Sequence, residues 1–148
     1  MNSISFRTNF GWISVFEENS KIVRIRFGKN QNKSISKNLK KTKLQIKNFL
    51  RKKIKTIHSN ILIKGNEAQK KIWRELTKIK VGETITYGEI AKKYNMSPRF
   101  VGKICGQNKI VLAIPCHRVI RSDGKMGGFS GYGGIKLKKK LLDFEKNF

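Results

Sequence analysis

The chain has 148 residues, of which 34 are Lys or Arg and 9 are Asp or Glu, so its formal net charge is +25 at pH 7. This length suits one domain or two small ones, and a hydrophobic content of 38% argues against a disordered chain. No apolar run reaches the roughly 20 residues that cross a bilayer, and the N-terminus lacks a signal-peptide core, so we expect a cytoplasmic protein with no membrane partner.

The excess of positive charge points to an anionic partner. A globule this basic repels itself unless its charge is neutralised, and nucleic acid is the commonest partner that does so. Residues 1–64 carry +14 (16 basic minus 2 acidic) and residues 65–148 carry +11 (18 minus 7), so the charge is spread along the chain. A solvated, lysine-rich surface that reflects biased codon usage is the alternative.

Residues 3–27 alternate apolar and polar side chains with the period of β-strands. A polar stretch at residues 17–20 interrupts the alternation, and Gly28 ends it. The pattern predicts an antiparallel hairpin or meander. Residues 29–41 are rich in Lys, Asn and Ser, which predicts a loop.

One amphipathic helix is predicted over residues 40–53. Its apolar stripe lies opposite a basic face and consists of Leu44, Ile46, Phe49 and Leu50. Residues 61–63 predict a short returning strand. Gly65 and Asn66 mark a boundary, which divides the chain into an N-terminal α/β domain at residues 1–64 and a C-terminal domain at residues 65–148.

The C-terminal domain is predicted to be mainly helical. Asn66 can cap a first helix over residues 67–79, whose apolar residues recur at intervals of three and four. Gly82 is expected to end this helix.

Two short helices joined by a tight turn are predicted next. Thr86 can cap the first, over residues 87–94, and Pro98 stands at the first position of the second, which runs to residue 107. The second helix carries Arg99 and Lys103, which fits a helix-turn-helix. An ordinary helical hairpin gives similar periodicity and is the alternative.

The last third of the chain begins with an apolar stretch at residues 110–120 and ends with an amphipathic helix over residues 136–146. Between them, residues 123–134 contain six glycines among twelve residues. Such a backbone tolerates positive φ and the close approach of a ligand or another segment. A plain flexible connector is the alternative.

Cys116 stands beside a base and a positive charge, because His117 and Arg118 follow it directly. A thiol of ordinary pKa is only about 3% thiolate at neutral pH, so a nucleophilic cysteine needs such a base or field. His117 would in turn need a carboxylate to orient its other nitrogen. The nearby choices are Asp123, Asp143 and Glu145.

A buried structural cysteine is the alternative for Cys116, and Cys105 is interpreted in that way. Two cysteines are too few for a disulfide scaffold. Together with His58 and His117 they lack the paired short spacings of zinc ligands, so no metal site is predicted.

These motifs resemble the O6-alkylguanine-DNA alkyltransferase family, also called methylated-DNA-protein-cysteine methyltransferases. The resemblance rests on the sequence IPCHRVI at residues 114–120, on the helix-turn-helix before it, and on the glycine-rich loop and a K-x-x-LL-x-x-E pattern after it. It covers residues 65–145, while the N-terminal half is similar in a looser way.

The resemblance implies an α+β fold in two parts. A small N-terminal antiparallel sheet with a helix, of ribonuclease H-like topology, is followed by a mainly helical, winged-helix-like domain with the helix-turn-helix.

The resemblance also implies a role for each matching residue at the reaction centre. Cys116 accepts the alkyl group, His117 activates it through a water molecule, and Glu145 orients His117. Tyr87 helps to rotate the DNA backbone and donates a hydrogen bond to the departing guanine. Asn108 ties the active-site turn to the helix-turn-helix.

Other residues match the DNA-binding and base-pocket positions of the family. Arg99 resembles an intercalating arginine that fills the space left by a flipped nucleotide, with a phosphate contact as the alternative. Gly102 matches the small residue that lets its helix approach the minor groove. The remaining contacts implied are with DNA for Lys103 and Arg118, and with the flipped base for Val119, Phe129 and Ser130.

The activity implied by the resemblance is direct DNA repair. After minor-groove binding and base flipping, the alkyl group of O6-alkylguanine in duplex DNA passes irreversibly to Cys116, with O4-alkylthymine as a second candidate substrate. Each molecule acts once and needs no cofactor. The zinc site of some members has no ligands here, because residues 1–64 contain no Cys and one His. The expected partner is double-stranded DNA with alkylated bases, bound by a monomer.

Two hypotheses from other functional classes stay open. A non-enzymatic protein would flip and recognise alkylated guanine and recruit other repair factors, although relatives of that type replace the reactive Cys. A DNA-packaging or regulatory protein would use only the charge and the helix-turn-helix, and would not need Cys116.

Overall fold

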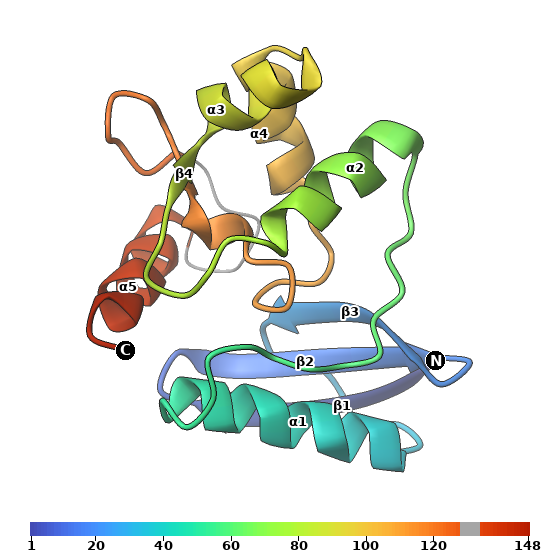
Figure 1. The fold of residues 1–148 in the computed structure, drawn as a ribbon. Helices are drawn as coiled ribbons and strands as arrows, with labels where there is room; N and C mark the ends of the chain where they lie inside the picture. The colour runs from blue at the N-terminus through green and yellow to red at the C-terminus, as the bar shows by residue number, and fades with distance from the viewer. Residues whose placement is uncertain (128–133) are drawn as a thin grey trace. The chain divides into compact units, whose positions relative to one another are not determined.

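An antiparallel meander forms the N-terminal sheet, as the alternating pattern predicted (Figure 1). Its strands are β1 (Asn2–Thr8), β2 (Gly11–Glu18) and β3 (Lys21–Phe27). Ile13 and Val15 of β2 are fully buried, so one face of the sheet is apolar and has to be covered. The structure, a computed structural model, describes residues 1–127 and 134–148.

The turn between β2 and β3 is shorter than the polar stretch at residues 17–20 predicted. Only Asn19 and Ser20 form it, with positive φ angles of 49° and 62° that suit a tight hairpin turn. Glu17 and Glu18 stay in β2. Glu17 is buried because three side chains donate hydrogen bonds to its carboxylate, namely Asn2, Ser36 and Asn38.

Helix α1 (Lys37–Leu50) packs on β1 and β2, and it begins and ends three residues earlier than predicted. The Ser36 side chain caps its first turn, and Lys52 has a positive φ of 61° that stops the helix from continuing. Leu44, predicted on the apolar stripe, is 55% exposed, so the buried face of α1 is rotated away from it.

Two short segments from later in the chain pair with the outer edge of β3. Ile61 forms a single parallel bridge with Ile22, and Ile110 forms one with Ile25. The returning strand predicted at residues 61–63 is thus reduced to one bridge. The two segments satisfy backbone groups that an unpaired edge strand would leave exposed.

The described residues divide into two compact units. The first comprises Met1–Lys64 and Lys109–Ala113, and the second comprises Gly65–Asn108 and Ile114–Phe148. This division differs from a linear split after residue 64 in one segment, because the bridge of Ile110 to β3 brings Lys109–Ala113 into the first unit.

The second unit contains three helices that each start where the sequence predicted. They are α2 (Glu67–Leu76), α3 (Tyr87–Tyr94) and α4 (Pro98–Gly106). The side chains of Asn66, Thr86 and Ser97 each accept a backbone N–H of the first turn, at 2.8 to 3.1 Å. Helix α2 ends at Leu76 rather than near Gly82, because the next residues turn with hydrogen bonds that span three residues instead of four.

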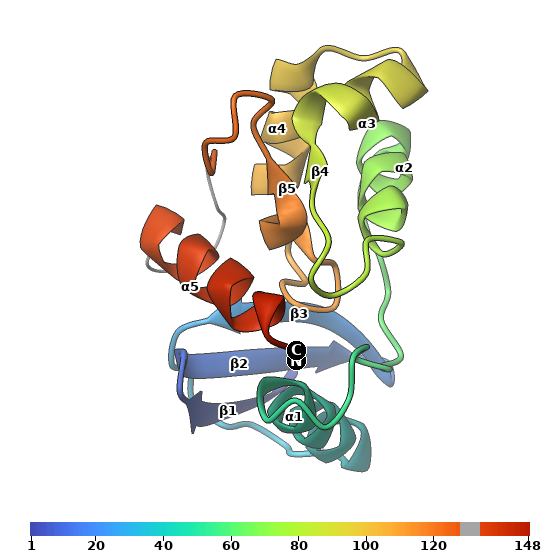
Figure 2. The ribbon, with the colours of Figure 1, turned by 60° about the vertical axis from the view of Figure 1, so that its left-hand side comes forward.

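The other elements of this unit are short, apart from a final helix (Figure 2). The elements are β4 (Ile85–Thr86), the 3₁₀ turn η1 (Cys116–Arg118), β5 (Val119–Ile120) and α5 (Gly134–Lys146). Strands β4 and β5 pair in parallel. The sequence did not predict this ladder, because two residues per strand carry no detectable alternation.

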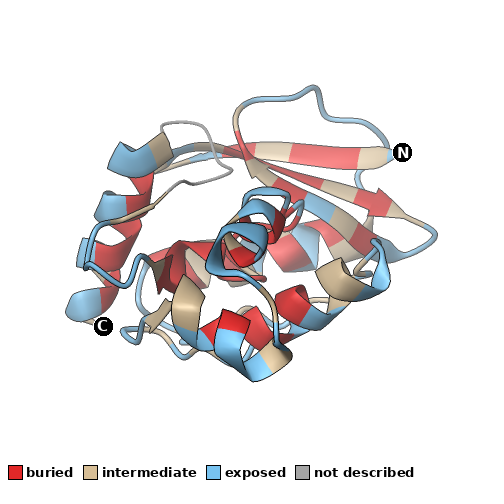
Figure 3. Ribbon diagram, turned by 90° about the horizontal axis from the view of Figure 1, so that it is seen from above, coloured by how far each residue is buried: buried red, intermediate tan, exposed pale blue. Residues whose placement is uncertain are grey.

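The helices are amphipathic, as Figure 3 shows by the buried and exposed residues that share each one. In the second unit, the Trp73 indole of α2 donates to the Ile104 carbonyl of α4 at 3.0 Å and fixes these two helices together. Among the helices that the structure describes, none combines the length and the apolar composition of a membrane span.

Candidate active site

Helices α3 and α4 are the two short helices joined by a tight turn that the sequence predicted, and their assignment as a helix-turn-helix stays a prediction. Asn95 ends α3 in the left-handed conformation, with a φ of 54°, and its N–H bonds to carbonyl groups of the last turn. Val101 and Ile104 of α4 face the interior. Arg99 and Lys103 are exposed, so the basic side of α4 is presented to solvent.

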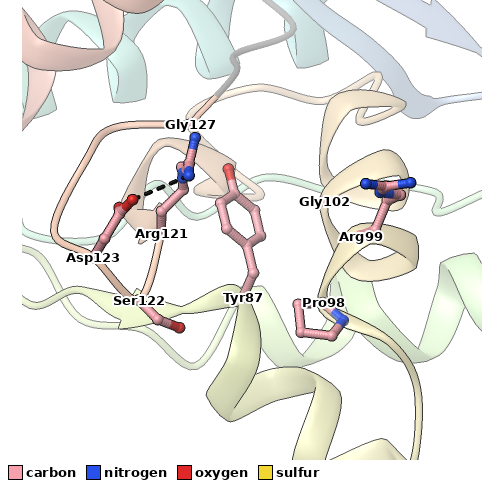
Figure 4. Close-up of a pocket in the computed structure, with 8 residues that line it drawn as sticks. All are labelled: Tyr87, Pro98, Arg99, Gly102, Arg121, Ser122, Asp123 and Gly127. Atoms are coloured by element: carbon pink, nitrogen blue, oxygen red, sulfur yellow. Dashed lines mark ion pairs between the residues drawn. The ribbon is translucent and has the colours of Figure 1, made fainter.

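A pocket of about 700 Å³ lies beside α4. Figure 4 shows the Tyr87 ring between α4 on one side and the loop at residues 121–127 on the other. The lining residues are Tyr87, Pro98, Arg99, Gly102, Arg121, Ser122, Asp123 and Gly127. The fold thus brings Tyr87, Arg99 and Gly102, which the sequence analysis singled out separately, to one hollow.

A close contact between Gly127 and Tyr87 shapes one wall of this pocket. Gly127 has a φ of +71°, and a Cβ at this position would lie 2.8 Å from the Tyr87 hydroxyl oxygen, so only glycine fits without moving the ring. A Cβ at Gly102 would lie 3.8 Å from the same ring, at ordinary contact distance. Packing among the described residues does not require glycine at position 102, and its predicted role at the minor groove stays a prediction.

Cys116 lies in a turn that two hydrogen bonds to one carbonyl hold in place. The Cys116 N–H and the Asn108 side-chain amide both donate to the Ile114 carbonyl, each at 2.8 Å. Asn108 stands two residues after the end of α4, so its side chain links the end of that helix to the turn. Cys116 is 4% exposed.

A buried carboxylate holds the two residues that follow Cys116. Oε2 of Glu145, in α5, lies 2.7 Å from Nε2 of the fully buried His117. The Arg118 guanidinium donates to both oxygens of Glu145, at 2.8 and 2.9 Å, and to the Ile79 carbonyl at 2.6 Å. Glu145 therefore orients the imidazole and the guanidinium together.

Of the three acidic residues considered for His117, only Glu145 contacts it. Asp123 pairs with Arg121 at 3.0 Å, and Asp143 pairs with Lys146 at 3.5 Å. Both carboxylates are largely exposed and lie outside the histidine network.

Arg118, for which a DNA contact was predicted, is engaged within the chain instead of being presented to solvent, and that contact stays a prediction. Arg118 is 6% exposed, and its guanidinium is engaged with Glu145 and a backbone carbonyl. Burying a guanidinium is costly unless a carboxylate compensates its charge, and Glu145 does so here. Arg118 is a positioning residue for that carboxylate.

Burial and hydrogen bonding set the ionisation of this network. Burial alone would raise the pKa of Glu145, but hydrogen bonds from His117 and Arg118 outweigh it and hold the pKa at about 2. Burial lowers the pKa of His117 against the pull of Glu145. These directions assign a carboxylate anion and a neutral imidazole whose Nε2–H donates to Glu145, which leaves the lone pair on Nδ1. Nδ1 has no hydrogen-bond partner among the described residues.

Lys138 is a buried cation of the site that the sequence analysis missed. Its Nζ donates to the Tyr87 hydroxyl at 3.1 Å and lies 5.5 Å from the centre of the Tyr87 ring. Burial lowers the pKa of Lys138 to about 8, and the negative charge of an ionised Cys116 or Cys105 opposes this shift. The available signal was its spacing, since position 138 lies on the same side of α5 as the buried residues Leu141, Leu142 and Glu145.

The Tyr87 hydroxyl and the Cys105 thiol both stay protonated at neutral pH. Burial raises the pKa of Tyr87 to about 12, with the charges of Cys105 and Cys116 adding to the shift. Burial also raises the pKa of Cys105 to about 12. Because the Lys138 ammonium donates to the Tyr87 oxygen, the phenol proton is left to donate to another acceptor.

Of the three residues predicted to line a base pocket, the structure describes only one. Val119 follows the Cys116 turn in β5 with a fully buried side chain, and its role in a base pocket stays a prediction. Phe129 and Ser130 lie outside the described residues. Within residues 1–127 and 134–148, no three His, Cys, Asp or Glu side chains gather as metal ligands would.

These features define a protein with two short helices joined by a tight turn and, in the same unit, a cysteine followed by a buried histidine–carboxylate pair. A family model described as the DNA-binding domain of 6-O-methylguanine DNA methyltransferase matches residues 67–147. A methylated-DNA–protein-cysteine methyltransferase of Metallosphaera sedula is 36% identical over 145 residues, which are 95% of this chain and 90% of the relative. One of Methanosarcina mazei is 39% identical over 105 residues, 70% of this chain and 65% of the relative.

A solved structure of similar fold supports the same relationship. The crystal structure of Mycobacterium tuberculosis OGT in complex with DNA has a TM-score of 0.88 to this chain at 27% identity, and covers 99% of this chain and 94% of that one. The chain therefore belongs to the family of methylated-DNA–protein-cysteine methyltransferases, as the motif around Cys116 predicted.

Proposed function

We propose that this protein repairs DNA by transferring the alkyl group of O6-alkylguanine to Cys116, once per molecule, with O4-alkylthymine as a second candidate substrate. The observation that carries the proposal is the 2.7 Å contact between His117, the buried residue that directly follows Cys116, and the Glu145 carboxylate. It supplies the neutral base that a thiol of ordinary pKa needs. Membership of the family supports the same class of reaction.

The transfer begins with the removal of the Cys116 proton. Nδ1 of His117 takes this proton, through a water molecule as the family resemblance implies, and the Glu145 carboxylate stabilises the imidazolium that forms. The thiolate sulfur then bonds to the alkyl carbon while the bond from that carbon to O6 breaks. The electron pair passes to guanine, which takes a proton from the Tyr87 hydroxyl and leaves as the neutral base, and the proton held by His117 returns through solvent to replace it.

The product explains the single turnover. An S-alkylcysteine is a thioether, which neither water nor cellular thiols cleave under mild conditions. No described group at the site could reverse its formation, so the protein is consumed.

Tyr87 and Lys138 assist the departure of guanine in this proposal. The Tyr87 phenol stays protonated, because burial raises its pKa to about 12. The Lys138 ammonium donates to the phenol oxygen at 3.1 Å, which fixes the direction of the remaining proton. A donor fixed in advance stabilises charge that develops on the leaving base.

The substrate base has to leave the duplex to react. Cys116 is 4% exposed, so a base that stays stacked cannot bring its O6 substituent to the sulfur. We assign Arg99, which lines the pocket with Tyr87, to the space left by the flipped nucleotide, and Lys103 to a phosphate contact. Gly102 would let α4 approach the minor groove, and the base pocket would be lined by Val119, Phe129 and Ser130.

Two finer features of the fold belong to the same proposal. The β4–β5 ladder beside α3 supports a winged-helix-like second unit. The meander followed by α1 supports a ribonuclease H-like topology for the first.

Replacing Lys138 with Met is expected to slow alkyl transfer by about 10²-fold without lowering the melting temperature. Met has a side-chain volume similar to that of Lys and removes a cation whose burial is costly, so the melting temperature should not fall. The Tyr87 hydroxyl, however, loses the hydrogen bond that fixes the direction of its proton. Single-turnover rates on a duplex with O6-methylguanine measure the first effect, and thermal unfolding measures the second.

The pH dependence of the transfer rate distinguishes a role of the Lys138 ammonium in the reaction from a role in packing. The Lys138 pKa of about 8 lies below its ordinary value, so the ammonium is present below pH 8 and is lost above it. The difference in rate between the wild type and Lys138→Met should therefore shrink as pH rises through 8. A lower melting temperature with an unchanged rate would show a structural lysine instead. Lys139→Met, at the exposed neighbouring position, is the control.

The mass of the peptide that contains Cys116 tests the proposed function. After incubation with an equimolar duplex containing O6-methylguanine, this peptide should gain the mass of one methylene group, and a second portion of substrate should remain unreacted. An unmodified Cys116 together with tight lesion binding would favour the non-enzymatic recognition protein. An unmodified Cys116 without lesion preference would leave only a general DNA-binding protein.

A further inference from the structure

One flank of α1, next to β1, carries a row of positive charge that the proposed reaction does not use. Lys40, Lys43, Lys47 and Arg51 follow one another at intervals of three and four, so they lie on one side of the helix. Arg7 of β1 extends the row, because it lines the same hollow as Lys47 and Arg51. We call these five residues the α1 basic face.

A small hollow of about 140 Å³ lies at one end of the α1 basic face. It is lined by Arg7, Thr8, Asn9, Lys47, Leu50 and Arg51. Three of these six side chains are cations and two are neutral with polar groups. A concave site with this lining suits a tetrahedral oxyanion such as a phosphate group.

The stability of α1 does not account for this arrangement. Like charges three and four residues apart repel one another, and the first turn of α1 has no acidic residue although it contains Lys37 and Lys40. Among the described residues, no carboxylate pairs with any member of the α1 basic face. Lys43 and Lys47 lie 5.8 and 6.0 Å from the Phe6 ring centre instead. The charges therefore lack compensation within the described chain.

We propose that the α1 basic face is a second DNA-contacting surface, which binds the phosphodiester backbone of duplex DNA independently of sequence and of base damage. The row from Lys40 to Arg51 spans about 16 Å of helix. One DNA strand offers about five phosphates over that length. The inference rests on the proposed function for the identity of the partner, and it adds a surface in the first unit to the one on α4.

The salt dependence of binding to undamaged duplex DNA tests this assignment. A protein that neutralises fewer phosphates releases fewer counterions when it binds. Each phosphate contact contributes about −0.9 to the slope of log K against the logarithm of the salt concentration. The triple variant Arg7→Gln, Lys47→Gln, Arg51→Gln should therefore make this slope less negative by about 2.7, which is three times 0.9. Fluorescence anisotropy at several salt concentrations gives the slopes.

A matched variant controls for the loss of net charge. Lys21→Gln, Lys29→Gln, Lys33→Gln removes three charges from exposed positions of the same unit, and should change the slope by less than about 1. Equal changes in the two triple variants would overturn the proposal, because the α1 basic face would then contribute only through net charge.

A second variant guards against loss of folding, since Lys47 is half-buried. Arg7→Gln, Lys40→Gln, Arg51→Gln changes only exposed side chains and should give the same shift in slope. Alkyl transfer from free O6-methylguanine base, which has no phosphate, should keep the wild-type rate in every variant. If the wild type transferred nothing, the proposed function would fail while the slopes still tested the surface. Normal transfer with unchanged slopes would reject the surface alone.

Discussion

Replacing Cys116 with Ser should abolish alkyl transfer, by a factor on the order of 10⁶ as for other lost nucleophiles, and leave binding of alkylated duplex DNA almost unchanged. A serine hydroxyl does not ionise near neutral pH, and the lowered pKa of His117 makes the imidazole too weak a base to force it. The change is nearly isosteric at a buried position, so the turn should keep its shape. Single-turnover assays and gel shifts with an O6-methylguanine duplex measure the two properties.

Cys105→Ser is the matched control for this experiment. Cys105 is also buried, and burial raises its pKa to about 12, so it should contribute no nucleophile. Transfer in this variant should stay close to the wild-type rate. Continued transfer in Cys116→Ser, or its loss in Cys105→Ser, would contradict the assignment of the acceptor.

Replacing Glu145 with Gln should have the largest effect on stability and a strong effect on rate. The amide leaves the buried Arg118 guanidinium without a compensating charge, which costs about 3–5 kcal/mol of unfolding free energy. It also removes the anion that stabilises a protonated His117, so the transfer rate should fall by roughly 10²–10⁴-fold. Urea unfolding and single-turnover kinetics measure these effects. Asp143→Asn, an exposed change on the same helix, should alter stability by no more than about 0.5 kcal/mol.

The same carboxylate should make the wild type sensitive to acid. The pKa of Glu145 is about 2 in the folded protein, below its ordinary value of 4.5, so its contribution to stability is full above pH 4.5 and is lost as pH falls towards 2. Unfolding free energy measured across this range should depend less steeply on pH in Glu145→Gln. Glu75 also has a pKa of about 2, because Lys93 and Tyr94 bind it, so part of the dependence should remain. Identical pH profiles in the two proteins would contradict the network.

The elements with strong local signals could be predicted from the sequence. Asn66, Thr86 and Ser97 are efficient caps next to apolar repeats, so the starts of α2, α3 and α4 agree with prediction. The meander followed from strict alternation. Helix ends were predicted less well, since the end of α2 depends on how the chain turns after Leu76 rather than on Gly82.

The candidate site could be predicted only in part, because burial decides what a charged residue does. Arg118 and Lys138 are two cations in a chain with 34. Only the helical spacing of Lys138 with the buried residues of α5 separates it from the exposed lysines, and no local pattern does so for Arg118. Tertiary packing buries both, one against Glu145 and the other against Tyr87. The choice of Glu145 among three carboxylates was likewise left open by spacing along the chain.

The pairing of Ile110 with β3 has a consequence for the order in which the protein is made. During synthesis from the N-terminus, residues 1–64 leave the ribosome before Lys109–Ala113 exists. Part of the outer edge of β3 therefore stays unpaired until α2, α3 and α4 have been translated. The nascent chain holds a strand edge open over this interval, and that edge can close only after Cys116 has been added, because Lys109–Ala113 has to leave the ribosome before it can pair.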